Sequence, residues 1–464
     1  MSLDPSSVHL SPSQVITRHR VSPWTAVPME QAFQLIETNM PQGTCKFIPT
    51  VLARPDQVLV SRVVSRYDVP EYHTSIKDGY AVIASDGSST RRVIGTRVAE
   101  ALSGDDNGSE ESCRPLQLGE CMRVCTGSVM PAGADAVVMV EKTTLIEHDG
   151  KEEQVIGVNE SVRVGQDVRQ PGSDIREGEC LVESGTILGS AEIGLLASTA
   201  RRDIEVYRRP RVCVMSTGNE IVDCSNEDVL QPGQVRDSNR PQLISLLQQK
   251  GFKAIDAGIV PDNRESLVEG IRVAFKFANV LISTGGVSMG EKDLMKDVLQ
   301  NEFNFTIHFG RVLMKPGLPA TFATGTFEDI QCAVFALPGN PVSSWVCTEL
   351  FAVPALRRMA GYTHPYQSVL QVKLGSSLKL DARPEYVRAV LAPPNSSITT
   401  YDLKEQRSTA YELLPIAYTT GSQASSRLLS LTGANLLLRL PKRSPELQVL
   451  PEGTVVDALV VGSI

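Results

Sequence analysis

The stretch ANVLISTGGVSMG, residues 278–290, decides the fold class. It starts as an apolar run of strand length and passes directly into two glycines, and the preceding stretch 264–277 has helical apolar spacing. The same step from apolar strand to glycine loop occurs in RVCVMSTGNE (211–220) and CAVFALPGNPVS (332–343). Alternating strands and helices predict a mostly parallel sheet covered by helices on both faces, which we expect over 201–365.

Outside this segment the chain changes to short β-rich runs separated by Gly, Pro and Asp, which are typical of small β-domains. Helical spacing in PMEQAFQLIETN (28–39) and SAEIGLLASTA (190–200) predicts a helix on each side of the first β-rich segment. With the section names that the family resemblance given below implies, the expected division is a disordered tail (1–22), the first part of a helical linking region (23–54), a β-rich inserted domain (55–159), the second part of the linking region (160–200), the α/β domain (201–365) and a C-terminal β-barrel (366–464).

Composition and charge exclude several partner classes. Of 464 residues, 42% are hydrophobic, and 45 Lys and Arg stand against 53 Asp and Glu, so the net charge of −8 offers no basic surface for nucleic acid or anionic membrane. The nine cysteines are odd in number and scattered, which indicates reduced thiols and a cytoplasmic location. Residues 1–22 lack the apolar segment of a targeting peptide. The longest apolar stretch, 342–356, contains Glu349 and Pro354 and predicts a buried amphipathic helix, not a membrane span.

The three glycine loops are candidates for an anion site. The carboxyl ends of parallel strands meet at one rim of the sheet, where ligands bind. Gly285 and Gly286 let the backbone approach a phosphate or oxyanion closely, and the amides of helices that start near Asp293 and Ser343 point toward such an anion. One loop alone is more often a simple turn, but the three together favour a phosphorylated or oxyanionic ligand.

Acidic residues accompany the loops. Glu220, Asp237 and Asp293 are carboxylates of the kind that hold Mg²⁺ beside a phosphate, and Asp78 lies further upstream. Asp237 is explained equally well as a helix N-cap, and Asp293 as a first-turn acid that the helix dipole stabilises.

Basic residues complement these acids. Four of them have the chemistry to recognise oxyanions: Lys315, Arg383, Arg388 and Arg427. Each alone is more often a solvated surface cation, and only proximity to the glycine loops would favour a binding role.

Several strings, in chain order, resemble one family. They are SIKDGYAV, TGSVMPAGADAVVMVE, GQDVRQPGSDI, MSTGNE, VRDSNR, GIVPDN, STGGVSMGEKD, MKPGLP, LPGNPVS, RPEYVR and SSRLLSLTGAN. From about residue 25 to the C-terminus the chain is similar to the molybdopterin molybdenumtransferases, or molybdenum insertases, a family that includes the C-terminal domain of gephyrin.

The resemblance implies the final step of molybdenum cofactor synthesis. In that step adenylylated molybdopterin is hydrolysed, AMP is released, and molybdenum from molybdate is placed on the dithiolene, with Mg²⁺ as the usual metal. It also implies an elongated subunit and a homodimer, with the cleft formed between the α/β section of one subunit and the inserted section of the other. A separate molybdopterin adenylyltransferase would supply the substrate.

The resemblance also assigns roles to residues. The implied catalytic residues are Asp293, Ser288, Lys315, Glu220 and Asp78, and the implied metal ligands are Asp293, Glu220 and Asp237. The implied substrate-binding residues are Thr126, Gly285, Gly286, Ser343, Asp237, Pro319, Arg383, Arg388, Ser425 and Arg427. Turn stabilisation is the alternative for Asp78 and Thr126. Leu318 stands where some relatives have Lys and Asn219 where many have Asp, so a contact of the family is in doubt at each.

Two other functions compete with the insertase. Gephyrin-like domains also act as scaffolds that hold receptor peptides in an apolar groove near the N-terminal helix, where Phe33 falls, although core packing is the simpler role for that ring. An adenylyltransferase is the weaker alternative, because the inserted section and the barrel argue against it. Retention of Ser288, Asp293 and Lys315 favours the enzyme over a pure scaffold.

Overall fold

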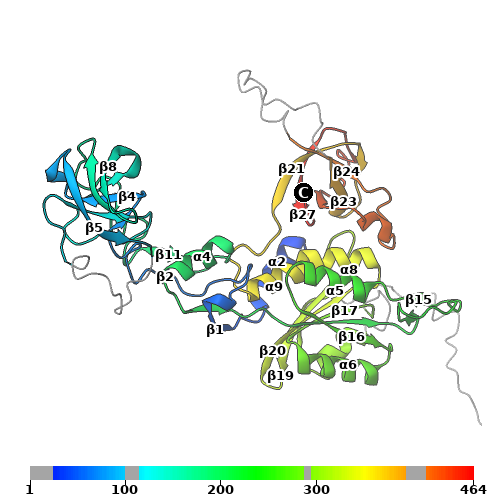
Figure 1. Cartoon of the computed structure of the whole chain (residues 1–464). Helices are drawn as coiled ribbons and strands as arrows, with labels where there is room; N and C mark the ends of the chain where they lie inside the picture. Colours follow the sequence, from blue (N-terminus) through cyan, green and yellow to red (C-terminus); the bar gives the residue numbers. More distant parts are fainter. Residues whose placement is uncertain (1–23, 100–113, 287–293, 393–413) are drawn as a thin grey trace, which may run out of the picture. The chain divides into compact units, whose positions relative to one another are not determined.

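The computed structural model describes residues 24–99, 114–286, 294–392 and 414–464 (Figure 1). The predicted tail and the polar loops 103–112 and 393–409 lie outside these residues. The chain forms two compact units. The first, here the α/β–barrel unit, comprises 1–46, Asp56–Val60 and Glu205–Ile464, and the second, the β-rich unit, comprises Phe47–Pro55 and Ser61–Ile204.

The α/β–barrel unit contains a six-stranded sheet. Its order is β16 (Ala254–Val260), β13 (Val212–Thr217), β17 (Val280–Thr284), β20 (Ile330–Leu337), β19 (Thr321–Phe327) and β18 (Thr306–Phe309). The first four strands pair in parallel, which confirms the mostly parallel sheet. The last two add an antiparallel edge, because Glu328 and Asp329 adopt positive φ and form a tight turn between β19 and β20.

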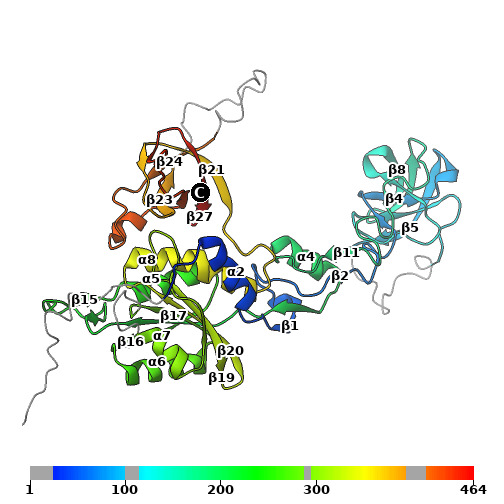
Figure 2. The same ribbon diagram turned by 180° about the vertical axis from the view of Figure 1, so that it is seen from behind.

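Helices cover both faces of this sheet (Figures 1 and 2). Helices α5 (Asn239–Gln249) and α8 (Pro341–Cys347) lie on one face, and α6 (Arg264–Phe277) and α7 (Leu294–Asn301) on the other. The sequence of α6 explains both its start and its packing. Asn263 caps the start of the helix by accepting the amide of Ser266 at 2.9 Å. Its apolar residues follow the helical period and bury one stripe against the sheet: Leu267, Ile271, Ala274 and Phe275.

The helix expected at 342–356 is present but is not amphipathic. It continues from α8 through a π-helical turn (Thr348–Ala352) into α9 (Val353–Met359), and nearly all of its side chains are buried, including that of Glu349. The expectation was wrong because the helix packs against the sheet and also against α2 (Met29–Asn39) and the barrel residues Leu437 and Val461. Among the described residues, no helix has the length and apolar character needed to cross a bilayer.

The C-terminal segment closes into the expected barrel. Its strands are, in order around the barrel, β21 (Val369–Leu374), β24 (Ile416–Thr419), β23 (Glu385–Leu391), β25 (Leu436–Leu440) and β27 (Val455–Val460). Two short strands of the same segment, β22 (Leu378–Lys379) and β26 (Val449–Leu450), form a separate pair. Alternate apolar side chains such as Val372, Val387 and Leu438 fill its interior.

The β-rich unit has its own sheet and core. The strand order is β7 (Ala136–Met139), β4 (Gly79–Val82), β6 (Glu120–Val124), β5 (Thr90–Arg97), β9 (Glu153–Val158) and β8 (Thr143–His148). The short pairs are β3 (Thr74–Ser75) with β10 (Val168–Arg169) and β2 (Val63–Val64) with β11 (Cys180–Val182), and the helix is α4 (Ser190–Ser198). The other strands within the described ranges are β1 (Cys45–Pro49), β12 (Asp203–Tyr207), β14 (Ile221–Val222) and β15 (Val235–Arg236).

Candidate active site

The loops after β13, β17 and β20 meet at one rim of the α/β sheet. The amide of Gly285 donates to the carbonyl of Leu337 at 3.1 Å. A Cβ atom on Gly285 would lie 2.2 Å from the carbonyl oxygen of Thr217, and one on Gly339 would lie 3.7 Å from the Cα of Gly285. We call these loops, Thr217–Gly218, Gly285–Gly286 and Gly339–Asn340, the glycine rim.

Glycine is required at two positions of the rim. Gly285 has φ +89° and Gly286 has φ +66°, a region where side chains are strained. A Cβ atom on Gly286 would also lie 2.9 Å from Thr217 Oγ1. The backbone of both glycines therefore comes close to Thr217, at a point where a side chain would not fit.

Three buried polar atoms at the rim or next to it have no hydrogen-bond partner among the residues that the structure describes. They are Thr217 Oγ1, Asn239 Oδ1 and Ser283 Oγ. A buried polar atom without a partner costs about 1–3 kcal/mol, so these atoms fit a polar ligand or bound water. Asn239 was not predicted from the sequence, although it stands in the quoted string VRDSNR, and its amide nitrogen donates to Gly339 O at 2.8 Å.

Asp237 is buried at the rim, with 3% of its surface exposed. Its Oδ1 accepts the hydroxyl of Ser216 at 2.9 Å and the amides of Asn239 and Arg240 at 3.1 and 3.2 Å, where α5 begins. Its Oδ2 lies 3.2 Å from Arg240 Nε. The bonds to the two amides are those expected if Asp237 caps helix α5. Its role as a metal ligand stays a prediction.

Two further carboxylates lie at the rim. Glu220 is exposed, and its carboxylate folds back over Gly218, where a Cβ atom would lie 2.6 Å from Glu220 Oε2. Asp262 is also exposed, and its Oδ1 would lie 3.9 Å from a Cβ atom on Gly286. Sequence analysis missed Asp262 although it follows β16 directly, the position at which parallel strands present ligands.

The described residues contain no cluster of three or more acidic, His or Cys side chains that would hold a metal on their own. Mg²⁺ is commonly held by one or two carboxylates together with phosphate oxygens and waters. The exposed carboxylates of Glu220 and Asp262 therefore fit such an ion. Asp293 and Ser288 lie outside the described residues.

Ser425 and Ser343 lie where α8 begins. The carbonyl of Ser425 accepts the amide of Val342 at 3.1 Å, and Ser425 Oγ is 3.1 Å from Asn340 Nδ2. Ser343 is buried in the first turn of the helix. The structure thus brings Ser425, from the barrel segment, to the glycine rim.

Lys315 belongs to a charged cluster at the edge of the barrel. Its Nζ lies 3.1 Å from Asp381 Oδ2 and 3.1 Å from Glu385 Oε1, and Asp381 also accepts Arg383 Nε at 3.2 Å. Burial lowers the pKa of Lys315, but the hydrogen bonds to Asp381 and Glu385 outweigh it, and the net shift is upward. Lys315 is therefore a protonated cation with two carboxylate partners.

The other predicted cations differ in exposure. Arg388 is completely buried, burial lowers its pKa to about 10, and its guanidinium donates to Ser430 and Ala424. Arg427 is exposed, and Pro319 is half-buried. Their binding roles stay predictions.

Asp78 and Thr126 form a pair in the β-rich unit. Asp78 Oδ1 accepts the amide of Thr126 at 2.6 Å and its hydroxyl at 3.1 Å, and the backbone hydrogen bond holds the pKa of Asp78 below its usual value. This pair joins two loops that are 48 residues apart in the chain, and both residues lie at an exposed surface, so their roles stay predictions.

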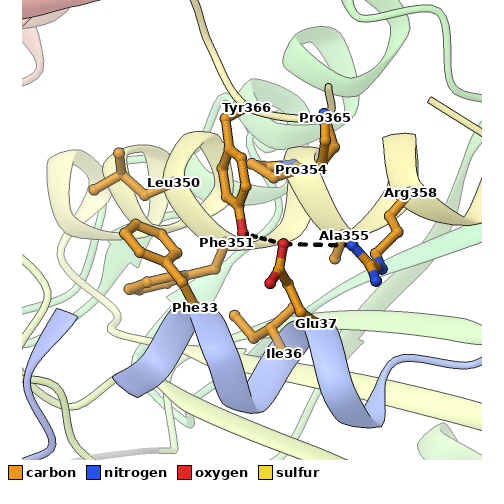
Figure 3. Close-up of a pocket in the computed structure, with 10 residues that line it drawn as sticks. All are labelled: Phe33, Ile36, Glu37, Leu350, Phe351, Pro354, Ala355, Arg358, Pro365 and Tyr366. Atoms are coloured by element: carbon orange, nitrogen blue, oxygen red, sulfur yellow. Dashed lines mark hydrogen bonds and ion pairs between the residues drawn. The ribbon is translucent and has the colours of Figure 1, made fainter. Parts of the chain in front are cut away.

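A pocket lies beside α2 in the α/β–barrel unit (Figure 3). Phe33 packs on Phe351 and Tyr366, with ring centroids 5.8 and 5.5 Å away, and is partly buried against the core. Glu37 Oε1 accepts the hydroxyl of Tyr366 at 2.9 Å and lies 3.4 Å from Arg358. Phe33 therefore has the predicted core contacts and also lines an open pocket.

Comparisons with known proteins identify the architecture. The MoeA N-terminal region (domain I and II) matches residues 27–200, and the probable molybdopterin binding domain matches residues 213–358. A crystal structure of the molybdopterin biosynthesis MoeA protein from Pyrococcus horikosii superposes with a TM-score of 0.74 and 25% identity, over 95% of this chain and 100% of that one. The fold and the rim thus define a protein of the MoeA class.

Sequence relatives define the family. A molybdopterin molybdenumtransferase of a Nostoc species is 35% identical over 71% of this chain and 73% of its own length. The chain belongs to the molybdopterin molybdenumtransferase family, a family of transferases of molybdenum cofactor biosynthesis, which confirms the resemblance and the fold class. Gephyrin of Dictyostelium discoideum is 33% identical over 96% of this chain, and the cofactor synthesis protein cinnamon of Drosophila melanogaster is 34% identical over 95%. The chain spans 64% and 67% of the lengths of these two relatives.

Proposed function

We propose that this chain catalyses the final step of molybdenum cofactor synthesis. Water adds across the phosphoanhydride bond of adenylylated molybdopterin and yields AMP and molybdopterin, and the dithiol then displaces one molybdate oxygen as water. The observation that carries the proposal is the glycine rim, where Gly285 and Gly286 bring the backbone close to the buried Thr217 hydroxyl, which has no hydrogen-bond partner among the described residues. A glycine loop beside a buried hydroxyl that lacks a partner suits a phosphate or oxyanion.

Charge neutralisation is the chemical requirement of the hydrolysis. Mg²⁺, when bound by Glu220 or Asp262 together with Asp293, would neutralise the phosphate oxygens. Lys315 and Arg383 are the cations that we assign to the molybdate dianion, and Ser425 adds a hydroxyl at the rim. Ser343, Gly285 and Gly286 would bind the pterin or its phosphate.

The test is AMP release and active-cofactor formation from adenylylated molybdopterin, molybdate and Mg²⁺. Asp293→Ala should lose activity and keep the melting temperature of the wild type. Asp149→Ala is the matched control, because Asp149 is exposed and its side chain accepts local hydrogen bonds in the β-rich unit, from the amides of Lys151 and Glu152 and from the side chain of Gln154. An inactive wild-type protein would contradict the proposal.

We further propose a homodimer in which Asp78 and Thr126 of one subunit complete the rim of the other. The apolar side chains of Phe47, Val51 and Leu52 are 72%, 86% and 65% exposed in the β-rich unit, as expected of a surface that a partner covers. If the site is shared, mixing inactive Asp78→Ala and Gly286→Ala subunits should restore roughly a quarter of wild-type activity, because half of the dimers then hold one intact site. No recovery in proven mixed dimers would contradict the shared site.

The pocket beside α2 supports a second function, the binding of peptides. It is a shallow depression, because the empty space of about 240 Å³ over it includes open solvent. Phe33, Tyr366 and Pro354 offer an apolar surface, with Glu37 and Arg358 at its edge (Figure 3). Selection from a displayed peptide library should yield apolar anchors whose binding falls in Phe33→Ala. The control Phe277→Ala removes an exposed ring at the end of α6. Equal binding by both variants would contradict this function.

A further inference from the structure

Arg388, on β23, is a completely buried cation of the barrel. None of the hydrogen bonds that its side chain makes within the described residues goes to a carboxylate. Its Nε and Nη2 atoms donate to Ser430 Oγ at 3.2 and 3.1 Å, and Nη2 lies 3.4 Å from the carbonyl of Ala424. Burying an arginine is costly unless its donors are used. Both acceptors lie in the segment 420–430, and Nη1 has no hydrogen-bond partner among the described residues. The contacts that offset part of the cost of burial are therefore all made to this one loop.

The main chain of Arg388 holds the same loop. Its amide donates to Gln423 Oε1 at 2.9 Å, and its carbonyl accepts Gln423 Nε2 at 3.2 Å and the amide of Thr420 at 3.1 Å. Ser430 Oγ in turn donates to the carbonyl of Arg427 at 2.7 Å. The loop is therefore fixed to the barrel at its two ends and through Ala424, next to Ser425.

The tip of the loop reaches the glycine rim. Ser425 accepts the amide of Val342 and lies beside Asn340, as described above. The Val342 amide belongs to the first turn of α8, where helix amides have no carbonyl within the helix. Protection of this amide from solvent therefore reports directly on the position of Ser425.

We propose that Arg388 is a positioning residue of the active site, which acts by holding the loop 420–430 so that Ser425 stays on the glycine rim. The proposal rests on the proposed function, because it takes the rim as the place where substrate binds. Arg388 itself has no exposed surface, so its effect passes through the loop. Arginine suits this task because its planar fork reaches two acceptors at once, whereas a lysine ammonium reaches them less well.

The test measures hydrogen exchange of the Val342 amide in the full chain, with selective ¹⁵N-valine labelling. In Arg388→Met the Val342 amide should exchange roughly tenfold faster, because the loop loses the stabilisation of about one hydrogen bond. Arg388→Lys should fall between Arg388→Met and wild type. The matched control is Arg439→Met, which removes an arginine from β25 of the same barrel, where it pairs with Asp457 and makes no contact with the loop in the described hydrogen bonds. Its Val342 exchange should equal that of wild type.

A kinetic readout accompanies the exchange. Arg388→Met should raise the KM for molybdate roughly tenfold and change kcat by less than about threefold, because the misplaced Ser425 weakens binding more than the reaction. A raised KM with unchanged Val342 exchange would overturn the proposal in favour of direct ligand contact. Equal acceleration in Arg439→Met would also overturn it, in favour of a general loosening of the barrel.

Two further results keep the outcomes separate. If Arg388→Met does not fold, Ser430→Ala removes the shared acceptor and keeps the arginine, and it should accelerate Val342 exchange; unchanged exchange there overturns the proposal. If the wild-type protein releases no AMP, the proposed function fails, while the exchange comparison still decides whether Arg388 positions the loop.

Discussion

The glycine rim and the edge of the barrel are formed by different chemical groups, backbone at the first and charged side chains at the second. At the rim, Gly285 and Gly286 bring backbone to within a few ångströms of Thr217, and the groups offered to a ligand are small polar side chains. At the barrel edge, Lys315 and Arg388 are held by hydrogen bonds and ion pairs with other side chains. Adding even one carbon atom to a site formed by closely packed backbone displaces it. In a charge network, a substitution removes one partner and leaves the other contacts in place.

This difference predicts how substitutions will act. Changes at the rim should remove activity in one step, because backbone carbonyls cannot move aside cheaply. Changes at the barrel edge should be graded and should depend on which partner remains.

The largest effect is expected for Gly285→Ala. The new Cβ would meet Thr217 O at 2.2 Å and the residue would keep φ +89°, so we expect a loss of more than about 3 kcal/mol of stability or a displaced rim. AMP release should fall at least about 100-fold in either case. Urea unfolding and the AMP assay measure the two quantities.

The control for Gly285 is Gly233→Ala. Gly233 has φ +93°, but nothing lies within 4 Å of its Cβ position, so this variant isolates backbone strain and should cost only about 1 kcal/mol. Similar losses in the two variants would show that strain, not close approach, dominates at the rim.

The next largest effect is expected for Lys315→Met. It leaves Glu385, which is 4% exposed, without its cation, and we expect a loss of roughly 1–3 kcal/mol, reduced because Lys315 itself is 34% exposed. Adding Glu385→Leu should recover part of this loss, since the buried charge is then gone. Urea unfolding of the four proteins of this double-mutant cycle gives the coupling, and strictly additive losses would contradict a coupled network.

The same contrast explains what the sequence could predict. The α/β sheet and the meeting of its glycine loops follow from strand–helix alternation and from the geometry of parallel strands, so Gly285, Gly286 and Gly339 were found by pattern alone. The partners of Lys315 and Arg388 come from strand pairing inside the barrel, and no local spacing indicates that Lys315 meets Asp381 or that Arg388 meets Ser430. Strand β19 was missed because the residues of the turn that leads from it into β20, Glu328 and Asp329, are not the glycines that usually mark a hairpin.

Asp237→Asn tests whether the rim contains a structural carboxylate. Asparagine caps helices about as well as aspartate, so the contacts to Ser216 and to the α5 amides should survive and only the ion pair with Arg240 should be lost. Arg240 keeps Asp223 and Asp256 as partners, so we expect a loss near 1 kcal/mol in urea unfolding and little change in the Mg²⁺ concentration for half-maximal activity. A rise of about tenfold in that Mg²⁺ concentration would instead show that Asp237 is a metal ligand.

The smallest effect at neutral pH is expected in the β-rich unit, where Glu120 forms a charge network with no proposed catalytic role. Hydrogen bonds from the side chain of Arg114, and further ones from Arg92 and the amide of Gln117, hold the pKa of Glu120 at about 2 despite the opposing effect of burial. Since the folded pKa lies below the unfolded value, the stabilisation is complete above about pH 4.5 and is lost as the pH falls toward 2.

Glu120→Gln should therefore cost less than about 1 kcal/mol at pH 7, because Arg92 and Arg114 are 53% and 30% exposed. Between pH 4.5 and 2 the wild-type unfolding free energy should fall more steeply than that of the variant, so that the two curves converge. Acid titrations of unfolding, followed by a probe within the β-rich unit, measure both slopes. Parallel curves would mean that the network is too solvated to stabilise the unit, and that graded charge effects belong only to the buried barrel edge.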